Sequence, residues 1–133
     1  MLNRISNHFD YRLQVINLRA ARQEVLATNI ANADTPNYKA RDIDFAAQLK
    51  RLQSGEGSFS MNQTHAGHLT PRGVSAAGAI AKYRDAVQPS IDGNTVDMNV
   101  EMARFTNNAI RYQADLGFMQ SQISGLKSAI SGQ

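Results

Sequence analysis

Hydrophobic residues recur every three or four positions at both ends of this chain. Near the N-terminus the spacing extends from residue 2 to about residue 33, with one interruption at Gln23–Glu24. Near the C-terminus it continues from Met98 to Ile130 without interruption. This period is typical of amphipathic α-helices with one apolar face. The pattern predicts a mainly α protein whose two long terminal helices, in segments 1–35 and 95–133, pair as a coiled-coil-like hairpin.

A helix with a single apolar stripe has to bury that stripe against another surface. Each predicted helix would be roughly 50 Å long at 1.5 Å per residue, which is more than a compact domain of this size needs. The stripes can pair with each other or with those of neighbouring subunits. Their larger members are therefore candidate assembly residues: Ile5, Phe9, Leu13, Ile16, Ile30, Met98, Met102, Phe105, Tyr112, Leu116, Met119, Ile123, Leu126 and Ile130.

The middle segment, residues 36–94, carries weaker signals. Pro36 cannot continue a helix, so the first helix should end just before it. Apolar residues at helical spacing predict one short helix near 43–52, and Asp42 and Asp44 are expected to cap it. Residues 53–79 hold five of the nine glycines. We expect this segment to be irregular, with short strands near 59–61 and 86–87.

The start of the second long helix is marked by polar residues. The run Asp92–Gly93–Asn94 predicts a turn. Asn94 or Thr95 is expected to cap the helix, with Asp97 and Glu101 in its first turns, where the helix dipole favours negative charge.

The composition narrows the class of protein. The chain has 133 residues, a net charge of +3 and no cysteine, which excludes disulfides and thiolate metal sites. The N-terminus does not resemble a secretory signal, and no apolar run is long enough to span a membrane. By ordinary rules such a chain is cytoplasmic, unless a specialised exporter carries it without a conventional signal.

Charge is sparse on the second helix. From Tyr112 to Gln133 only Asp115 and Lys127 are charged, whereas a solvated coiled coil usually carries many Glu and Lys residues. Ser, Gly and Gln at the remaining positions indicate a surface that neighbouring subunits cover.

The first helix carries three arginines on a related face, Arg12, Arg19 and Arg22. They form either a solvated basic face or one half of ion pairs between subunits. Arginine suits the second role because its guanidinium binds a carboxylate bidentately. The candidate acidic partners are Asp97, Glu101 and Asp115 of a neighbouring subunit.

No constellation typical of catalysis is present. His65 and His68 lie in the glycine-rich segment with no acidic cluster or metal-binding motif nearby, and there is no phosphate-binding or dinucleotide-binding motif. The sequence predicts no enzyme activity, no cofactor and no metal site.

Two motifs resemble a known family. Residues 26–45, LATNIANADTPNYKARDIDF, resemble the N-terminal signature of bacterial flagellar rod and hook proteins, and residues 90–98, SIDGNTVDM, are the second match. With the short length, the chain is similar to the FlgB family of proximal-rod subunits. Asn37 stands where the family often has Gly, and Asn tolerates the left-handed backbone that such a turn requires. The motif residues are Asn29, Asn32, Thr35, Pro36 and Tyr38.

The resemblance implies a structural subunit of the proximal rod in the flagellar basal body. Such subunits are exported unfolded by the flagellar type III secretion system, without a cleaved signal, and polymerise in the periplasmic space into a tube that transmits motor torque. The implied partners are copies of the chain, FlgC-like rod proteins, the basal adapter FliE and the export gate. Phe45 and Leu49 fit the spacing of the gate-recognition pattern; they also fit one side of a short core helix.

Two other classes stay open on the pattern alone. A cytoplasmic coiled-coil adaptor would account for the helices, and a weakly basic helical nucleic-acid-binding protein would account for the charge. The thin spread of basic residues argues against nucleic acid as a partner.

Overall fold

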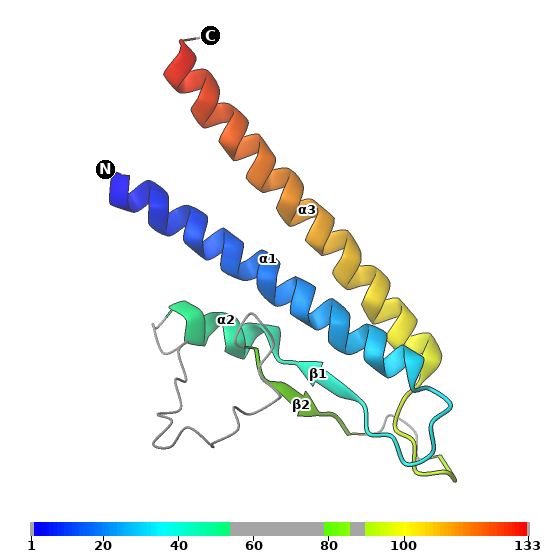
Figure 1. The fold of residues 1–133 in the computed structure, drawn as a ribbon. Coiled ribbons are helices and arrows are strands. Elements are labelled where there is room, and N and C mark those ends of the chain that lie inside the picture. Colours follow the sequence, from blue (N-terminus) through cyan, green and yellow to red (C-terminus); the bar gives the residue numbers. More distant parts are fainter. Residues whose placement is uncertain (1, 54–78, 86–89, 133) are drawn as a thin grey trace, which may run out of the picture.

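The computed structural model describes residues 2–53, 79–85 and 90–132, and the side chains of residues 2–5 and 52–53 lie outside this description. The elements follow in the order α1 (Leu2–Ala31), β1 (Arg41–Ile43), α2 (Phe45–Gln53), β2 (Ala81–Tyr83) and α3 (Met98–Ser131). The two long terminal helices lie side by side, as Figure 1 shows. The prediction of a mainly α protein with paired terminal helices is confirmed.

The long helices form an antiparallel hairpin with two different ends. At one end, which we name the closed end, α1 finishes, α3 begins, and the connecting segments 32–40 and 90–97 turn. At the other, the open end, α1 starts and α3 finishes, and the two helices diverge (Figure 1). Each helix begins and ends within four residues of the limits of its predicted segment, because periodicity and Pro36 set these limits.

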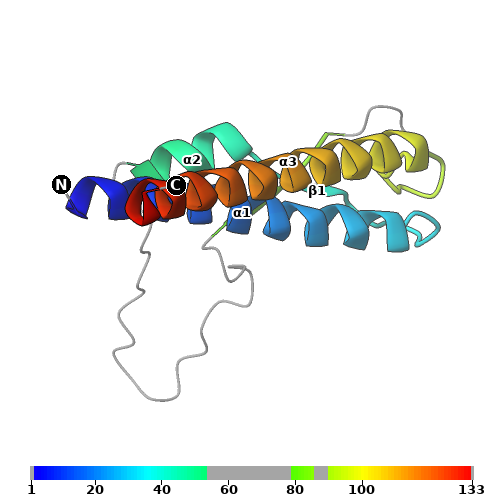
Figure 2. The ribbon, with the colours of Figure 1, turned by 90° about the horizontal axis from the view of Figure 1, so that it is seen from above.

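A small apolar core lies on the side of α1 that faces the middle segment. Leu18 and Ala21 of α1 are buried against Ile43 and Ala79. The half-buried Phe45 and Leu49 of α2 pack onto the same cluster. α2 contacts α1. Seen from above, α3 passes in front of part of α1 (Figure 2). This core holds the middle segment against α1 rather than against α3.

The short helix α2 begins two residues later than predicted. Asp44 caps it, since its Oδ1 accepts a hydrogen bond from the Ala47 N–H at 3.1 Å. The prediction that Asp42 is also a cap is wrong, because Asp42 belongs to β1 and its carboxylate binds arginines. Charge-assisted hydrogen bonds and ion pairs with three guanidinium groups stabilise the Asp42 carboxylate more than a helix end would.

Two three-residue strands pair within the middle segment. β1 and β2 are antiparallel, with Arg41 opposite Tyr83 and Ile43 opposite Ala81. The Arg84 N–H donates to the Ala40 carbonyl at 3.0 Å and extends this pairing. The strands expected at 59–61 and 86–87 lie outside the described residues.

The start of α3 differs from the prediction. The helix begins at Met98, and its N-cap is Asp97, whose Oδ1 accepts hydrogen bonds from the N–H groups of Asn99 and Val100. The predicted caps Asn94 and Thr95 are therefore wrong. Both have other partners, because the Asn94 side chain binds the end of α1 and the Thr95 hydroxyl accepts from the Ala40 N–H at 2.8 Å.

Candidate assembly surface and the polar contacts beside it

Polar side chains of α3 bind α1 along the length of the hairpin. They come from four positions of α3 spaced seven residues apart, which we name the polar seam: Glu101, Asn108, Asp115 and Gln122. A seven-residue spacing returns a helix to nearly the same face. Each of the four contacts α1, and the sequence signal for them was a heptad of polar residues three positions from the apolar stripe.

The middle of the seam is held by Asn108 and Asp115. The buried Asn108 Nδ2 donates to the Gln23 Oε1 at 2.6 Å and to the Arg19 carbonyl at 2.9 Å. Asp115 forms an ion pair with Arg19. Towards the open end, Gln122 Nε2 lies 3.2 Å from His8 Nε2. These contacts fix the register of the two helices, which is a common role for buried polar groups between helices.

Glu101 anchors the seam at the closed end. It is fully buried, and its Oε2 accepts a hydrogen bond from the Asn29 Nδ2 at 2.9 Å. Its Oε1 is paired with Arg84, which follows β2. A buried carboxylate requires such compensation, because removing charge from water is costly. One side chain of α3 therefore holds both α1 and the strand pair.

A second charged group extends this contact. The Asp42 carboxylate accepts two hydrogen bonds from Arg22, at 2.8 and 2.9 Å. Arg84 and Arg104 also approach Asp42, at 3.8 and 3.6 Å. The hydrogen bonds that Arg22 donates to Asp42 raise the pKa of Arg22 above its ordinary value. The paired Arg22 and Asp42 side chains hold β1 on α1.

The predicted motif residues Asn29 and Tyr38 lie together at the end of α1. The Asn29 side chain pairs with the backbone of Arg41, donating to its carbonyl at 2.6 Å and accepting from its N–H at 3.1 Å. The Tyr38 hydroxyl donates to Asn29 Oδ1 at 3.2 Å. Asn29 thus joins α1, β1 and α3.

The other motif residues shape the turn after α1. Asn32 Nδ2 donates to the Thr28 carbonyl at 2.8 Å, and the Thr35 hydroxyl donates to Asn32 Oδ1 at 3.2 Å. Pro36 is exposed. Asn37 has a φ of 60°, in agreement with the predicted left-handed turn.

Asn94 closes this turn from the other side, and sequence reasoning missed that role. Its Nδ2 lies within hydrogen-bond distance of three carbonyls, those of Asn32 at 3.1 Å, Ala33 at 2.6 Å and Thr35 at 3.0 Å. Its Oδ1 accepts from the Val96 N–H at 2.8 Å. One buried amide therefore satisfies the backbone groups that the end of a helix leaves without partners.

The charges predicted to pair between subunits have partners within the chain. Arg19 is paired with Asp115, Arg22 with Asp42, and Glu101 with Arg84. Asp97 caps α3. Arg12 donates to His8 Nε2 at 3.2 Å on the exposed side of α1.

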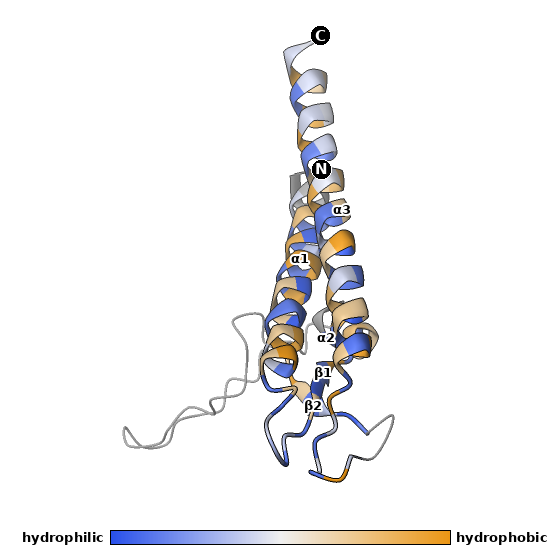
Figure 3. Ribbon diagram, turned by 90° about the vertical axis from the view of Figure 1, so that its right-hand side faces the viewer, coloured by the Kyte–Doolittle hydropathy of each residue, from blue (hydrophilic) through white to orange (hydrophobic). Residues whose placement is uncertain are grey.

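Most residues of the predicted apolar stripes are not fully buried within this hairpin. Figure 3 shows apolar positions recurring along α3 up to its end, which extends beyond the start of α1. Ile16 alone of the described stripe list is buried, and Ile5 lies outside the described side chains. The half-buried members are Phe9, Ile30, Phe105, Tyr112 and Met119. The exposed members are Leu13, Met98, Met102, Leu116, Ile123, Leu126 and Ile130.

Stripe residues of both helices meet in one groove. It has a volume of about 490 Å³, and its apolar lining comprises Ala20 and Ala27 of α1 with Phe105, Ala109 and Tyr112 of α3. Leu18 and Ala20 are separated by roughly 200° around the helix. The groove therefore lies on the side of α1 opposite the core. We name it the apolar groove.

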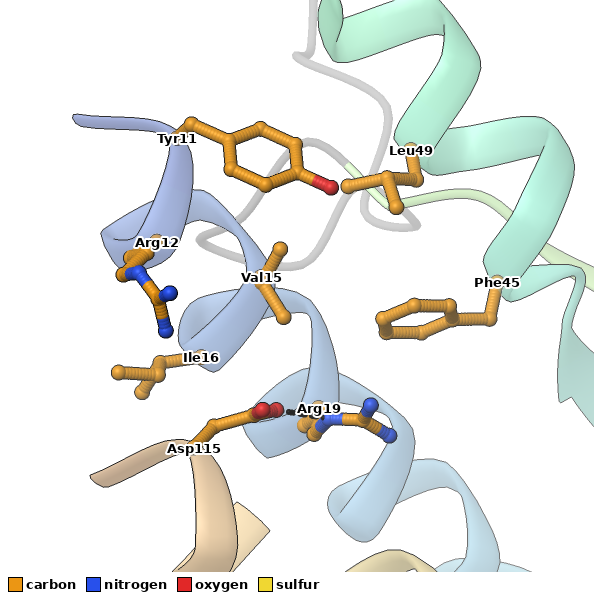
Figure 4. A pocket seen from close by; sticks show the side chains of 8 residues that line it. All are labelled: Tyr11, Arg12, Val15, Ile16, Arg19, Phe45, Leu49 and Asp115. Atoms are coloured by element: carbon orange, nitrogen blue, oxygen red, sulfur yellow. Dashed lines mark hydrogen bonds and ion pairs between the residues drawn. The ribbon is translucent and has the colours of Figure 1, made fainter. Parts of the chain in front are cut away.

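Phe45 and Leu49 face α1 across a smaller pocket of about 280 Å³ (Figure 4). Tyr11 and Val15 of α1 point towards them in this view. The Arg19 guanidinium lies 4.6 Å from the centre of the Phe45 ring, a cation–π distance. In the folded chain these two side chains are half-buried.

The described residues offer no group of three His, Asp or Glu side chains that could bind a metal ion. No helix among them has the length and hydropathy required to cross a bilayer.

Comparison with known proteins identifies the family. The flagellar basal body rod protein FlgB of Salmonella typhimurium (strain LT2) is 42% identical over 136 residues, which cover 99% of each chain. This chain belongs to the FlgB family of flagellar basal body rod proteins. A FlgB protein of Escherichia coli (strain K12) is 42% identical over 134 residues, covering 98% of this chain and 97% of its own. A FlgB protein of Cereibacter sphaeroides (strain ATCC 17029) is 50% identical over 120 residues, covering 90% and 91%.

The family model described as a flagella basal body rod protein matches residues 16–39. This stretch contains Asn29, Asn32, Thr35 and Tyr38, so it coincides with the closed end of the hairpin. As a member of the FlgB family, the chain is a structural protein of the flagellar basal body rod.

Proposed function

We propose that this chain polymerises through its terminal helices into the proximal part of the rod, where the polymer transmits motor torque. The observation that carries the proposal is the apolar stripe of α3, most of which is exposed while α3 contacts α1 through the polar seam. A stripe that is exposed in a single chain stabilises the assembly when neighbouring helices bury it. Torsional stiffness would then arise from many helix contacts between subunits.

Neighbours are expected to be copies of the chain and FlgC-like rod proteins, with the basal adapter FliE at the base. The off-stripe surface of the last turns of α3 supports close neighbours, since Ser and Gly allow backbones to approach. Between residues 116 and 132 the one charged side chain is Lys127. The location that follows is the periplasmic space.

Export in an unfolded state by the flagellar type III secretion system is the second part of the proposal. The absence of cysteine and the small core around Leu18 and Ile43 support it, because a marginally stable chain without disulfides unfolds readily. Phe45 and Leu49 are half-buried against α1 in the folded chain, so a gate that reads them would need the unfolded form.

The assembly claim is tested with Leu116→Asp and Met119→Asp in a strain without its own copy of the gene. We expect secretion of the chain to be unchanged, while rods and swimming are lost, because a buried charge is not tolerated in an apolar contact. Leu116→Met is the matched control that keeps the apolar volume. Normal swimming of both Asp variants would refute the proposal.

The export claim is tested separately with Phe45→Ala. Secreted protein should fall before any defect of assembly, whereas Leu13→Ala, which also shortens an apolar side chain, should leave secretion unchanged. If the Phe45 variant is secreted normally, the gate assignment is wrong and the assembly claim is unaffected.

A further inference from the structure

We infer that the apolar groove of one copy receives the C-terminal third of α3 from a second copy. This inference rests on the proposed assembly function and names the two surfaces that would meet. The acceptor is the groove between α1 and α3, and the donor is the exposed face that contains Ile123, Lys127 and Ile130.

The acceptor has small residues on both sides of one acidic residue. Ala20, Glu24 and Ala27 follow the spacing i, i+4, i+7 and line the groove from α1. The larger Phe105 and Tyr112 form its opposite wall on α3. Alanine at two of these positions leaves holes that side chains of another helix can fill.

The donor has the inverse pattern at the same spacing. Ile123, Lys127 and Ile130 lie at i, i+4, i+7 on one face of α3. Ile123 is 51% exposed and Ile130 is 87% exposed, so much of this face is open within the chain. Copies of a rod share one polarity, so the α3 of a second copy runs antiparallel to α1. An antiparallel helix laid along α1 would place Ile123 beside Ala27, Lys127 beside Glu24 and Ile130 beside Ala20.

Charge supports a copy of this chain as the occupant. In the part of the chain that the structure describes, neither Glu24 nor Lys127 forms an ion pair. Lys127 is the one charge on the donor segment, and Glu24 is the one charge among the residues that line the groove. An opposite pair in the middle of an apolar contact selects the partner and its register.

The symmetry of the contact fits a polymer. Donor and acceptor are different surfaces, since the groove lies in the half of the hairpin nearest the closed end whereas the donor lies at the open end. A contact between unlike surfaces leaves one of each free on every pair, so copies add without closing into a dimer.

The first test uses thiols, because the natural chain has no cysteine. Two differently tagged copies, Ala20→Cys and Ile130→Cys, are produced together in flagellated cells, and isolated basal bodies are oxidised. We expect a disulfide-linked pair at about ten times the yield of the control combination, Ala20→Cys with Ser128→Cys, since position 128 lies roughly 200° from position 130 around the helix. Equal yields overturn the inference, as does linkage of the Ala20→Cys copy to another rod protein only.

The second test exchanges the charges. Glu24→Lys and Lys127→Glu should each reduce the number of assembled rods about fivefold, and the double variant should recover most of the loss. Single variants that assemble normally, or a double variant as poor as the singles, overturn the inference. Swimming of a strain that carries the unaltered chain tests the proposed function, whereas the charge variants test this contact. Failure of the contact and failure of the function are therefore distinguishable.

Discussion

The two ends of the hairpin differ in how far their side chains have partners within the chain. At the closed end, Asn29, Asn94 and Glu101 are buried and each has at least two polar partners within the chain. At the open end, α1 and α3 diverge, and Ile123, Leu126 and Ile130 are exposed (Figure 1). The closed end is complete as a single molecule, whereas the open end presents apolar surface whose burial requires other molecules. Substitutions should therefore affect stability at one end and assembly at the other.

The largest loss of stability is expected for Glu101→Ala at the closed end. The substitution leaves Arg84 and Asn29 without their shared partner, and breaking a buried ion pair costs about 3 kcal/mol of the free energy of unfolding. Urea denaturation followed by circular dichroism measures the loss. Glu24→Ala, the same change at an exposed position, is the control and should change stability by less than about 0.5 kcal/mol. Equal losses of stability in the Glu101→Ala and Glu24→Ala variants would contradict the role of buried polar contacts at the closed end.

A smaller loss is expected for Asn94→Ala. The variant removes the amide that binds the carbonyls after α1, at a cost of about 2 kcal/mol for the backbone groups left without a partner. The measurement is the same, and Asn107→Ala on the exposed side of α3 should cost nothing. A stability equal to that of the natural chain would mean that this turn does not depend on Asn94.

Gly93→Ala tests the backbone of the same turn. Gly93 has a φ of +73°, and a Cβ there would lie 2.7 Å from Asn37 Oδ1. We expect a loss of about 1 kcal/mol, because an L-residue is strained in this region. Gly117→Ala in the interior of α3 has open space around its new Cβ and should instead stabilise by about 0.5 kcal/mol. If the urea midpoint of Gly93→Ala lies above that of Gly117→Ala, the turn at Gly93 does not require a positive φ.

The smallest effect on stability is expected at the open end, for Ile123→Ser. Its exposed side chain contributes little within the chain, so the free energy of unfolding should change by less than about 0.5 kcal/mol. Swimming should nevertheless be lost, because the apolar face would no longer be attractive to a neighbour. Ile123→Leu should preserve both properties. If the Ile123→Ser chain unfolds easily but the cells still swim, the open end contributes to stability rather than to assembly, which is the reverse of our expectation.

The long helices were predictable because ten apolar residues from Met98 to Ile130 keep one period and because Pro36 ends the first pattern. The face used for pairing was not. An apolar stripe is a stronger sequence signal than a polar heptad, so the stripe was expected to be the surface that joins the helices. Within the chain the polar seam beginning at Glu101 also binds α1, beside the stripe residues of both helices that line the apolar groove.

The middle segment was less predictable for another reason. Three-residue strands such as Arg41–Ile43 are too short to show an alternating pattern, and they form because Arg22, Arg84 and Glu101 hold them in place. The predicted caps of α3 were Asn94 or Thr95, and Asp97 was expected in the first turns of the helix. Only the position of the end of α1 decides that Asn94 binds carbonyls and that Asp97 caps.

Both termini of the chain lie at the open end (Figure 1). A fluorescent protein or an affinity tag fused to either terminus would therefore occupy the space that the proposed assembly assigns to neighbouring helices. Labelled copies should be incorporated only when unlabelled copies outnumber them. Tracer dilution, rather than full replacement, is consequently the appropriate way to image this subunit in living cells.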